Sequence, residues 1–427
     1  MNVLKVFFSP YPWDVRVEKI CRGLVAGGHE VTLLCRNERL QPADEVIDGF
    51  RVTRIRPPRI GAPAFNQWWN APLPVNPVWW AHIAAALARE RPDVVLIRDI
   101  PLAVPSAALA RACGIPTVLD MAENYPAAMA EWRRWERGGA TRALTRNVVA
   151  ARALERASVR AVNHVVVVAE EQRSRLVAMK VPPRRVWLAS NTPELDRASR
   201  IDRGLQQELR QRFRGRTVVL YVGELHLHRG IDTAIRAVSR ARAQLGDPLL
   251  LLVGKGIHER LLRRIAAAQG GQELVHFEGW VRPELVASYV ASCDIALVPH
   301  RASEHTNTTL PNKLFDYMAH GKPVVVSDAA PMARIVNAEG CGTVFRSGDG
   351  DSLARAILHA ADPTRGPRMG LRGRQAVLRE YNWDVDFRRL CSALETAAGG
   401  ARKRCGRASR AGPGVGRAGR SGAHADS

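Results

Sequence analysis

Apolar residues along this chain follow two patterns that alternate over most of its length. Short runs of valine, leucine and isoleucine are typical of buried parallel strands, and apolar residues three or four positions apart are typical of amphipathic helices. In the first half, strands are expected at 3–8, 31–35, 93–97, 117–120, 165–168 and 186–188, and helices at 16–26, 82–91, 103–113 and 142–161. This alternation predicts a doubly wound parallel sheet covered by helices.

The second half repeats the alternation after a polar stretch, A-S-N-T-P-E-L-D, that has the composition of a domain linker. Strands are expected at 217–222, 249–253, 275–278, 295–299 and 324–326, and helices at 230–243, 259–268, 284–291 and 383–394. We therefore expect an α/β protein with two Rossmann-like, doubly wound domains and a cleft between them. The expected divisions are a first domain at 1–189, a linker at 190–200, a second domain at 201–375, a C-terminal helix at 376–396 and a disordered basic tail at 397–427.

The segment 308–328, T-T-L-P-N-K-L-F-D-Y-M-A-H-G-K-P-V-V-V-S-D, is the most informative part of the chain. Pro311 favours a helix start and Gly321 favours a helix end, so a helix of about ten residues is expected between them. The apolar side chains that would pack inward from this helix are Leu314, Phe315 and Met318. A strand should follow directly at 324–326.

The start of this helix combines several groups that bind anions. Free backbone N–H groups and the positive end of the helix dipole would lie beside Thr308, Thr309, Asn312 and Lys313. Such a site most often holds a phosphate, and Asp316, one turn deeper, could accept hydrogen bonds from sugar hydroxyls. An ordinary surface helix with a solvated lysine would carry the same residues, so the segment alone does not decide between the two interpretations.

Two glycine turns follow other strands of the second domain. Gly223 ends one strand, and the loop after it brings Arg229 beside the start of a helix. The turn V-G-K-G at 253–256 carries Lys255. One glycine turn is weak evidence, but the order of the strands places both turns at the cleft. Together they indicate a site for a nucleotide diphosphate.

The first domain offers an acidic loop, D-M-A-E-N, after its strand at 117–120. We expect Asp120 and Glu123 to line the cleft, because parallel sheets place functional groups after the carboxyl ends of their strands. A purely structural role, in which Asp120 caps the following turn, fits the same sequence.

Composition and charge narrow the class of protein. Of the 427 residues, 46% are hydrophobic, which suits a globular protein, and the formal net charge is +22. A basic balance of this size favours phosphates, nucleic acid or an anionic membrane surface as partners. The seven cysteines lack C-x-x-C spacing and indicate reduced thiols in a cytoplasmic protein. With no apolar run long enough to span a bilayer, we expect a soluble protein or one bound peripherally to a membrane.

Four tryptophans in the proline-rich segment 65–80 allow two interpretations. They could pack against the first domain or be presented to a lipid interface, where tryptophan is favoured. We favour packing. No metal site is expected: Asp384-Val385-Asp386 would open a helix rather than follow a strand, and His226 and His228 have no third ligand nearby.

These motifs resemble the retaining glycosyltransferases of the GT-B fold, in the large fourth family that uses nucleotide-activated sugars. The matching segments are R-V-E-K with A-G-G-H-E-V-T, Y-V-G with R-G-I-D, F-E-G-W-V, C-D-I-A-L-V-P, P-N-K-L-F-D-Y-M-A-H-G-K-P-V-V-V-S-D and Y-N-W-D-V. The resemblance covers nearly the whole chain, and P-N-K-L-F is its most specific part. It implies that the first domain binds the acceptor, that the second binds the sugar nucleotide, and that the helix after Asn382 crosses back to the first domain.

The chain departs from the family pattern at three places. The family's pair of glutamates eight positions apart is replaced by Thr308 and Asp316, and Glu224 stands where an arginine usually follows the glycine. The usual histidine on the acceptor side is replaced by Asp120 and Glu123. The resemblance implies front-face transfer with retention, in which a donor diphosphate oxygen helps to deprotonate the acceptor. Lys313 and Arg229 would neutralise the leaving group, with no metal or other cofactor.

The function implied is transfer of a sugar to a polysaccharide or lipid-linked acceptor in the assembly of cell-surface polysaccharides or glycoconjugates. A sugar-nucleotide epimerase has a similar two-domain architecture and would also bind the nucleotide. A basic nucleic-acid-binding protein is the alternative from another class, supported only by the net charge and the arginine-rich tail. It lacks a recognition helix or aromatic and basic residues interleaved on a strand face, so nucleic acid is not an expected partner.

Overall fold

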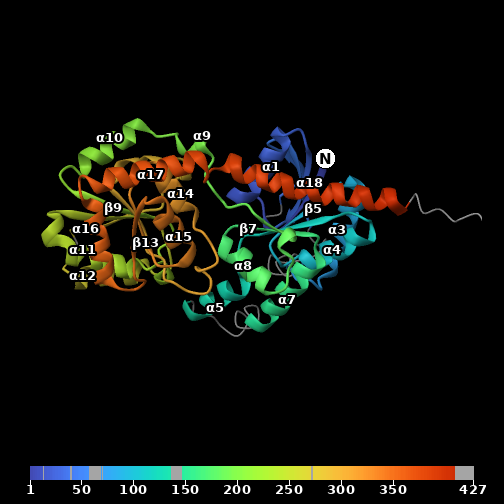
Figure 1. Cartoon of the computed structure of the whole chain (residues 1–427), viewed down its shortest axis with the longest axis horizontal. Helices are drawn as coiled ribbons and strands as arrows, with labels where there is room; N and C mark the ends of the chain where they lie inside the picture. The colour runs from blue at the N-terminus through green and yellow to red at the C-terminus, as the bar shows by residue number, and fades with distance from the viewer. Residues whose placement is uncertain are drawn as a thin grey trace, which may run out of the picture.

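The computed structural model describes residues 1–12, 14–38, 41–56, 69, 71–135, 147–270 and 273–408, with side chains described to 399. It has two lobes, each built on one sheet with helices packed against it (Figure 1). The first lobe holds an eight-stranded sheet and the second a six-stranded sheet. The predicted class, an α/β protein with two parallel-sheet domains, is therefore confirmed.

The first sheet has the strand order β3-β4-β2-β1-β5-β6-β7-β8, and only the β3–β4 pair is antiparallel. Its strands are β1 (Asn2–Pro10), β2 (Glu30–Arg36), β3 (Asp44–Ile47), β4 (Phe50–Arg54), β5 (Val94–Arg98), β6 (Thr117–Met121), β7 (His164–Val167) and β8 (Val186–Leu188). Its helices are α1 (Val15–Ala26), α3 (Pro77–Glu90), α4 (Ala103–Ala112), α5 (Tyr125–Trp135), α7 (Val148–Ala161) and α8 (Glu170–Ala178). All five residues of β5 are buried, as expected for a central strand covered on both faces.

The second sheet is wholly parallel, with the order β11-β10-β9-β12-β13-β14. Its strands are β9 (Thr217–Val222), β10 (Pro248–Val253), β11 (Val275–Gly279), β12 (Ile295–Val298), β13 (Val324–Ser327) and β14 (Gly342–Phe345). Its helices are α9 (Leu195–Ala198), α10 (Arg203–Arg212), α11 (Ile231–Leu245), α12 (Glu259–Ala268), α13 (Val286–Ser292), α14 (Asn312–Ala319), α15 (Ala330–Glu339), α16 (Gly350–Ala361) and α17 (Arg365–Arg379). The strand order reverses between β9 and β12, which places a ligand crevice outside their carboxyl ends.

The last helix, α18 (Trp383–Ala408), leaves the second lobe and lies along the first (Figure 1). Trp383, Leu390 and Leu394 join the hydrophobic core beneath β1, β2 and β5. Ala397 and Ala398 are also buried. The predicted helix end at 396 and the tail from 397 are thus wrong for residues 397–408, which continue α18, with Ala397 and Ala398 extending its packed face; residues 409–427 lie outside the described part.

Other differences from the expected elements have local causes. Helix α14 has 8 residues rather than about ten, because Pro311 keeps an extended conformation and serves as the N-cap. Within the predicted helix at 142–161 the structure describes Val148–Ala161, and 142–146 lie outside the described residues. The pattern did not predict β3, β4, β14, α5, α8, α9, α10, α15, α16 and α17.

The tryptophan segment is packed where it is described. Trp79 is fully buried in the core of the first lobe, and Trp69 packs against that core. The indole N–H of Trp80 donates to the carbonyl of Pro74 at 2.7 Å. The packed interpretation is confirmed for Trp69 and Trp79, whereas the hydrogen bond of Trp80 stays within the tryptophan segment; Trp68 lies outside the described residues.

Candidate active site

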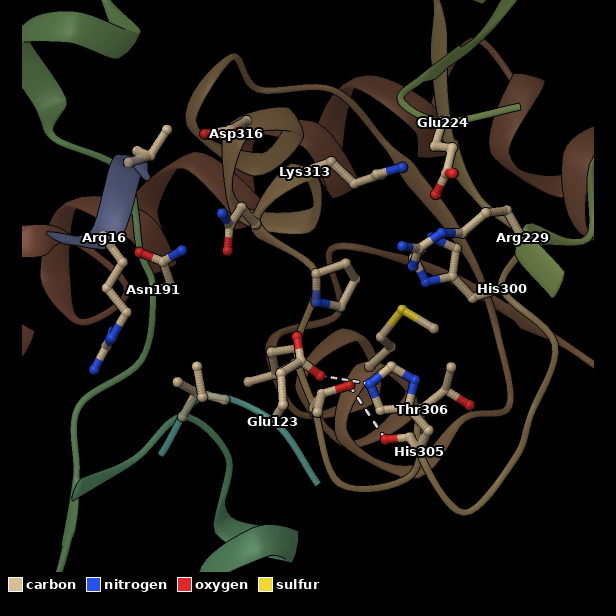
Figure 2. Close-up of a pocket in the computed structure, with 18 of the residues that line it drawn as sticks. Arg16, Glu123, Asn191, Glu224, Arg229, His300, His305, Thr306, Lys313 and Asp316 are labelled. Atoms are coloured by element: carbon tan, nitrogen blue, oxygen red, sulfur yellow. Dashed lines mark hydrogen bonds and ion pairs between the residues drawn. The ribbon is translucent and has the colours of Figure 1, made fainter. Parts of the chain in front are cut away.

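A cavity of about 550 Å³ lies between the lobes, at the carboxyl ends of the strands of both sheets (Figure 2). Its second-lobe lining comes from the β9 turn, the segment after β12 and the start of α14. Its first-lobe lining comes from the start of α1 and the loop after β6. The lining residues are Asp14, Val15, Arg16, Arg98, Ala122, Glu123, Val168, Asn191, Glu224, Arg229, His300, His305, Thr306, Thr309, Leu310, Pro311, Asn312, Lys313, Asp316 and Met332.

The start of α14 opens directly onto this cavity. Pro311, the N-cap residue, contributes no side-chain hydrogen bond to the first turn. Free N–H groups and the positive end of the helix dipole therefore face the cavity. Lys313 extends from this turn across the ring of Tyr221, with Nζ 4.1 Å from the ring centroid. Gly223 makes room for this ammonium group, because a Cβ there would lie 2.5 Å from Nζ.

Arg229 enters the cavity from a short 3-10 turn, Leu227–Arg229, between β9 and α11. Gly230 follows it with φ 71°, and a Cβ at that position would lie 1.9 Å from the carbonyl oxygen of Pro299. Only glycine therefore lets this turn pack against the end of β12. No hydrogen bond or ion pair to the guanidinium of Arg229 is found among the described residues. Figure 2 shows Lys313, Glu224, Arg229 and His300 gathered in one part of the cavity.

The positive charge in this part of the cavity is largely uncompensated. Burial and the nearby Arg229 hold the pKa of Lys313 well below its usual range. Glu224 lies close by but makes no ion pair within 4 Å of either cation in the described structure. An anion bound here would relieve the repulsion between the two cations, which is the electrostatic signature of a phosphate site.

Asp120 is not at the cavity surface, which corrects the expected placement. It lies within β6, not in the loop after it, and is fully buried. Arg16 donates to its Oδ1 from Nη2 at 2.7 Å, and Lys5 and Arg98 lie 3.7 and 3.8 Å from its Oδ2. Burial would raise the pKa of Asp120, but Arg16 and Lys5 outweigh it and hold the pKa well below the usual range. Asp120 is therefore an ionised anchor for Arg16.

Arg16 ties this network to the linker between the lobes. Asp14 caps α1 by accepting from the N–H of Val17, which fixes the first turn and directs Arg16 inward. The guanidinium also donates to the carbonyls of Ala189 and Ser190 at 3.0 and 3.1 Å.

Glu123 does line the cavity, and it is paired across the lobes. His305, in the segment between β12 and α14, contacts Glu123 through Nε2 at 2.5 Å (Figure 2). Its Nδ1 contacts Glu131 at 2.8 Å. Burial would lower the pKa of His305, but the hydrogen bonds to the two carboxylates outweigh it and raise the pKa to about 9. The same hydrogen bond lowers the pKa of Glu123 against the effect of its burial. We call Glu123, His305 and Glu131 the interlobe bridge.

A second cavity of about 340 Å³ lies on the other side of α14 and shares Val15, Asn191, Asn312 and Asp316 with the first. Its walls include Lys19 from α1, Pro283 and Val286. Lys19 is buried, donates to the carbonyl of Thr192 at 2.6 Å and lies over the ring of Trp383. Burial lowers the pKa of Lys19 to about 7 and raises that of Asp316 to about 6. Asp316 thus stands between a cationic chamber and a partly apolar one.

The predicted residues divide into two groups. The structure brings together Arg229, Thr309, Asn312, Lys313, Asp316 and Glu123 around the cavity. Thr308 is buried and receives a hydrogen bond from Asn124 at 3.2 Å, so its expected place in the anion site is corrected. Lys255 is exposed and does not line this cavity, because its turn points past the end of β11.

Several cavity residues were not predicted, among them Asp14, Asn191, His300, His305 and Thr306. His300 could have been found, because it lies two residues after the strand β12, at the expected edge of the sheet. His305 carried no such signal: its partners lie 174 and 182 positions earlier in the chain.

Within the residues that the structure describes, no cluster of three or more metal-ligating side chains has the arrangement of a metal site. Asp386, from the D-V-D sequence, is buried and accepts from the hydroxyl of Thr192 at 2.7 Å.

No helix of the described part is long and apolar enough to span a bilayer.

Two family models match the chain, one for each lobe. Residues 14–192 match a family described as "Glycosyl transferase 4-like domain", and residues 216–362 match one described as "Glycosyl transferases group 1". The first match contains Glu123, and the second contains Arg229, Lys313 and Asp316.

Curated relatives match part of the chain. A GDP-mannose-dependent alpha-(1-6)-phosphatidylinositol monomannoside mannosyltransferase from Mycolicibacterium smegmatis is 29% identical over 182 residues, 42% of this chain and 48% of the relative. The amylovoran biosynthesis glycosyltransferase AmsK from Erwinia amylovora is 25% identical over 227 residues, 52% of this chain and 54% of the relative. The matched part of the chain thus spans about half the length of these relatives.

Solved structures match over almost the entire chain. Sucrose-phosphate synthase from Thermosynechococcus elongatus superposes with a TM-score of 0.71 at 19% identity, covering 95% of this chain and 99% of that one. Anabaena HepE, in complex with UDP-glucose, gives a TM-score of 0.67 at 15% identity, covering 93% and 100%. At this identity the likeness concerns the fold. With both lobes matched by family models and the architecture shared, the chain belongs to the group 1, family 4-like glycosyltransferases and has their GT-B fold.

Proposed function

We propose that this protein transfers a sugar from a nucleotide diphosphate sugar to an acceptor hydroxyl, with retention of anomeric configuration, in the assembly of a cell-surface polysaccharide or glycoconjugate. The observation that carries the proposal is the uncompensated cationic part of the interlobe cavity. Lys313, Arg229 and the uncapped start of α14 converge there. Such a chamber suits a diphosphate better than a neutral sugar.

The donor would then occupy both cavities. Its diphosphate would lie against Lys313 and Arg229, its ribose hydroxyls beside Asp316, and its base in the partly apolar second cavity. The transferred sugar would face Glu123 and the first lobe. The mannosyltransferase from Mycolicibacterium smegmatis is named for GDP-mannose, and HepE is named as a complex with UDP-glucose, so these two sugar nucleotides are the first donors to test.

In the proposed reaction the acceptor oxygen bonds to the anomeric carbon on the face from which the diphosphate leaves. The bond between that carbon and the phosphate oxygen breaks, and its electron pair stays on the diphosphate. The acceptor proton passes to a diphosphate oxygen. Lys313 and Arg229 stabilise the charge that develops on the leaving group, because they are already in place before it forms.

A thermal-shift titration with GDP-mannose, UDP-glucose and their diphosphates tests donor binding. A donor at 100 times its dissociation constant should stabilise the protein by about 2.7 kcal/mol. Incubation of the bound donor without acceptor then separates the transferase from an epimerase, since only an epimerase releases a new sugar nucleotide. No stabilisation by any nucleotide diphosphate would contradict the proposed function.

We also propose peripheral attachment to an anionic membrane, where a lipid-linked acceptor would be found. The net charge of +22 supports it, since each Lys or Arg near such a surface contributes about 1 kcal/mol. Vesicles rich in anionic lipid should carry the protein upward in a flotation gradient at low salt, whereas neutral vesicles should not. A protein that stays at the bottom with both would contradict the attachment.

A further inference from the structure

His300 is a buried histidine that the proposed mechanism does not use. It directly follows Pro299 at the end of β12, contributes to the wall of the cavity and is 2% exposed. Its Nε2 is shielded from solvent and has no hydrogen-bond partner among the described residues. Buried polar atoms are nearly always hydrogen-bonded in folded proteins, so an unpaired one beside a cavity indicates that a bound ligand supplies its partner.

The charges around His300 come from three segments of the second lobe and are mostly positive. The titratable neighbours that face it are Arg229 and His228 from the 3-10 turn, Lys313 from α14 and His305 from its own loop. The carboxylates that line the same cavity are Glu123 and Glu224, together with Asp14 and Asp316. Figure 2 shows the His300 ring beside the Arg229 side chain, at the cationic end of the cavity.

We propose that His300 takes up a proton when the donor diphosphate enters the cavity and then binds the diphosphate as a third cation, beside Arg229 and Lys313. This inference rests on the proposed function. It makes His300 a group that contacts the leaving diphosphate and that changes its charge with the occupancy of the site.

The electrostatics of the empty cavity support this change. Burial, together with Arg229 and Lys313, holds the pKa of His300 well below its ordinary value, so its ring is neutral. A bound diphosphate brings at least two negative charges next to the same ring. Opposite charge within a few ångströms favours the charged form of an imidazole, and the two cations then face the diphosphate rather than each other. The empty cavity thereby avoids a third unpaired positive charge.

Isothermal titration of GDP and of UDP, each in HEPES and in Tris buffer near neutral pH, measures the protons exchanged on binding, because the two buffers differ in ionisation enthalpy and neither contains phosphate. We expect net proton uptake by the wild-type protein. His300→Gln keeps a hydrogen-bond donor but cannot take up a proton, so we expect smaller uptake and about 10-fold weaker binding. The matched control is His164→Gln. His164 is partly buried and its pKa is also lowered by burial, but it lies at the start of β7, away from the carboxyl ends of the strands that form the cavity. This control should behave as the wild type.

A second measurement does not depend on the variant's folding. In wild-type protein labelled with ¹⁵N at its 12 histidines, GDP or UDP should convert one neutral imidazole to an imidazolium. Equal proton uptake by wild type and His300→Gln, or the absence of any conversion in the ¹⁵N spectrum, would overturn the role of His300 alone. If the wild-type protein binds neither diphosphate, the proposed function falls and this inference falls with it.

Discussion

The two walls of the cavity differ in whether their charged side chains are paired within the protein. On the first-lobe side, Asp120, behind the cavity surface, is enclosed by Arg16, Lys5 and Arg98, and Glu123, at the surface, is held by His305 of the second lobe. On the second-lobe wall, Lys313 and Arg229 make no ion pair within the described residues. Buried charges normally require partners, so a wall whose cations lack them is suited to bind an anion from outside. The charges on the first-lobe side are therefore already paired within the protein, which we call the self-sufficient wall, and the second wall is completed by its ligand.

Removing charge from the self-sufficient wall should destabilise the fold. Asp120→Asn leaves Arg16 and Lys5 buried without their counter-ion, whereas Arg98 keeps its pairs with Asp14 and Asp99, and we expect a loss of about 3–5 kcal/mol in the free energy of unfolding. Urea denaturation measures it. Asp351→Asn, on an exposed pair with Arg240, is the control and should change stability by no more than about 0.5 kcal/mol. If Asp120→Asn hardly changes the free energy of unfolding, the first wall does not depend on this network.

Removing charge from the second wall should instead spare the fold and reduce catalysis. Lys313→Ala and Arg229→Ala each take away a preorganised donor to the leaving diphosphate, with an expected loss on the order of 10²–10³ in turnover, or roughly 3–4 kcal/mol. Relief of the repulsion between the two cations should keep the melting temperature unchanged or raise it. Arg263→Ala, on an exposed pair with Glu259, is the control. Wild-type turnover by a folded Lys313→Ala protein would refute the diphosphate site.

The interlobe bridge predicts a pH dependence that belongs to the first wall. The pKa of His305 is raised from 6.5 to about 9, so its pairing with Glu123 and Glu131 stabilises the protein fully below pH 6.5. This contribution is lost as the pH rises through about 9. One pKa unit corresponds to about 1.4 kcal/mol, which gives an upper limit of roughly 3 kcal/mol. Urea denaturation between pH 6.5 and 9 should show this loss in the free energy of unfolding of the wild type and not in that of His305→Gln. If the free energies of both proteins change with pH in the same way, the interlobe bridge does not contribute to stability.

The comparison also shows what sequence could and could not predict. The second wall was found from local patterns: a strand end with Gly223, a turn with Arg229, and the P-N-K helix. Each of these signals lies within about ten residues, and the rule for parallel strand ends brings them together. The fold was predictable for the same reason, since its strands are short, apolar and regularly spaced.

The first wall was not predictable in the same way. Asp120 was expected to face the cleft because it stood at the last position of its expected strand, but the strand continues to Met121 and the Asp120 side chain is fully buried. Its partners Arg16 and Lys5 lie more than a hundred positions away. His305 pairs with carboxylates of the other lobe, and no local pattern encodes such a contact. The length of α18 was missed because alanine and glycine carry little apolar signal.

Asp316, which separates the two cavities, offers the finest test of the distinction between the walls. Burial raises its pKa to about 6, so ionised Asp316 is mildly unfavourable in the empty protein. Asp316→Asn should therefore leave the melting temperature unchanged or slightly higher, and it should weaken donor binding about 5- to 10-fold, or roughly 1 kcal/mol, through weaker hydrogen bonds to sugar hydroxyls. Because the carboxylate forms as the pH rises through about 6, wild-type affinity should gain a component there that Asp316→Asn lacks. Isothermal titration of the identified donor from pH 5 to 8 compares the two proteins. Equal affinity throughout would remove Asp316 from the donor site and leave the second wall to Lys313 and Arg229 alone.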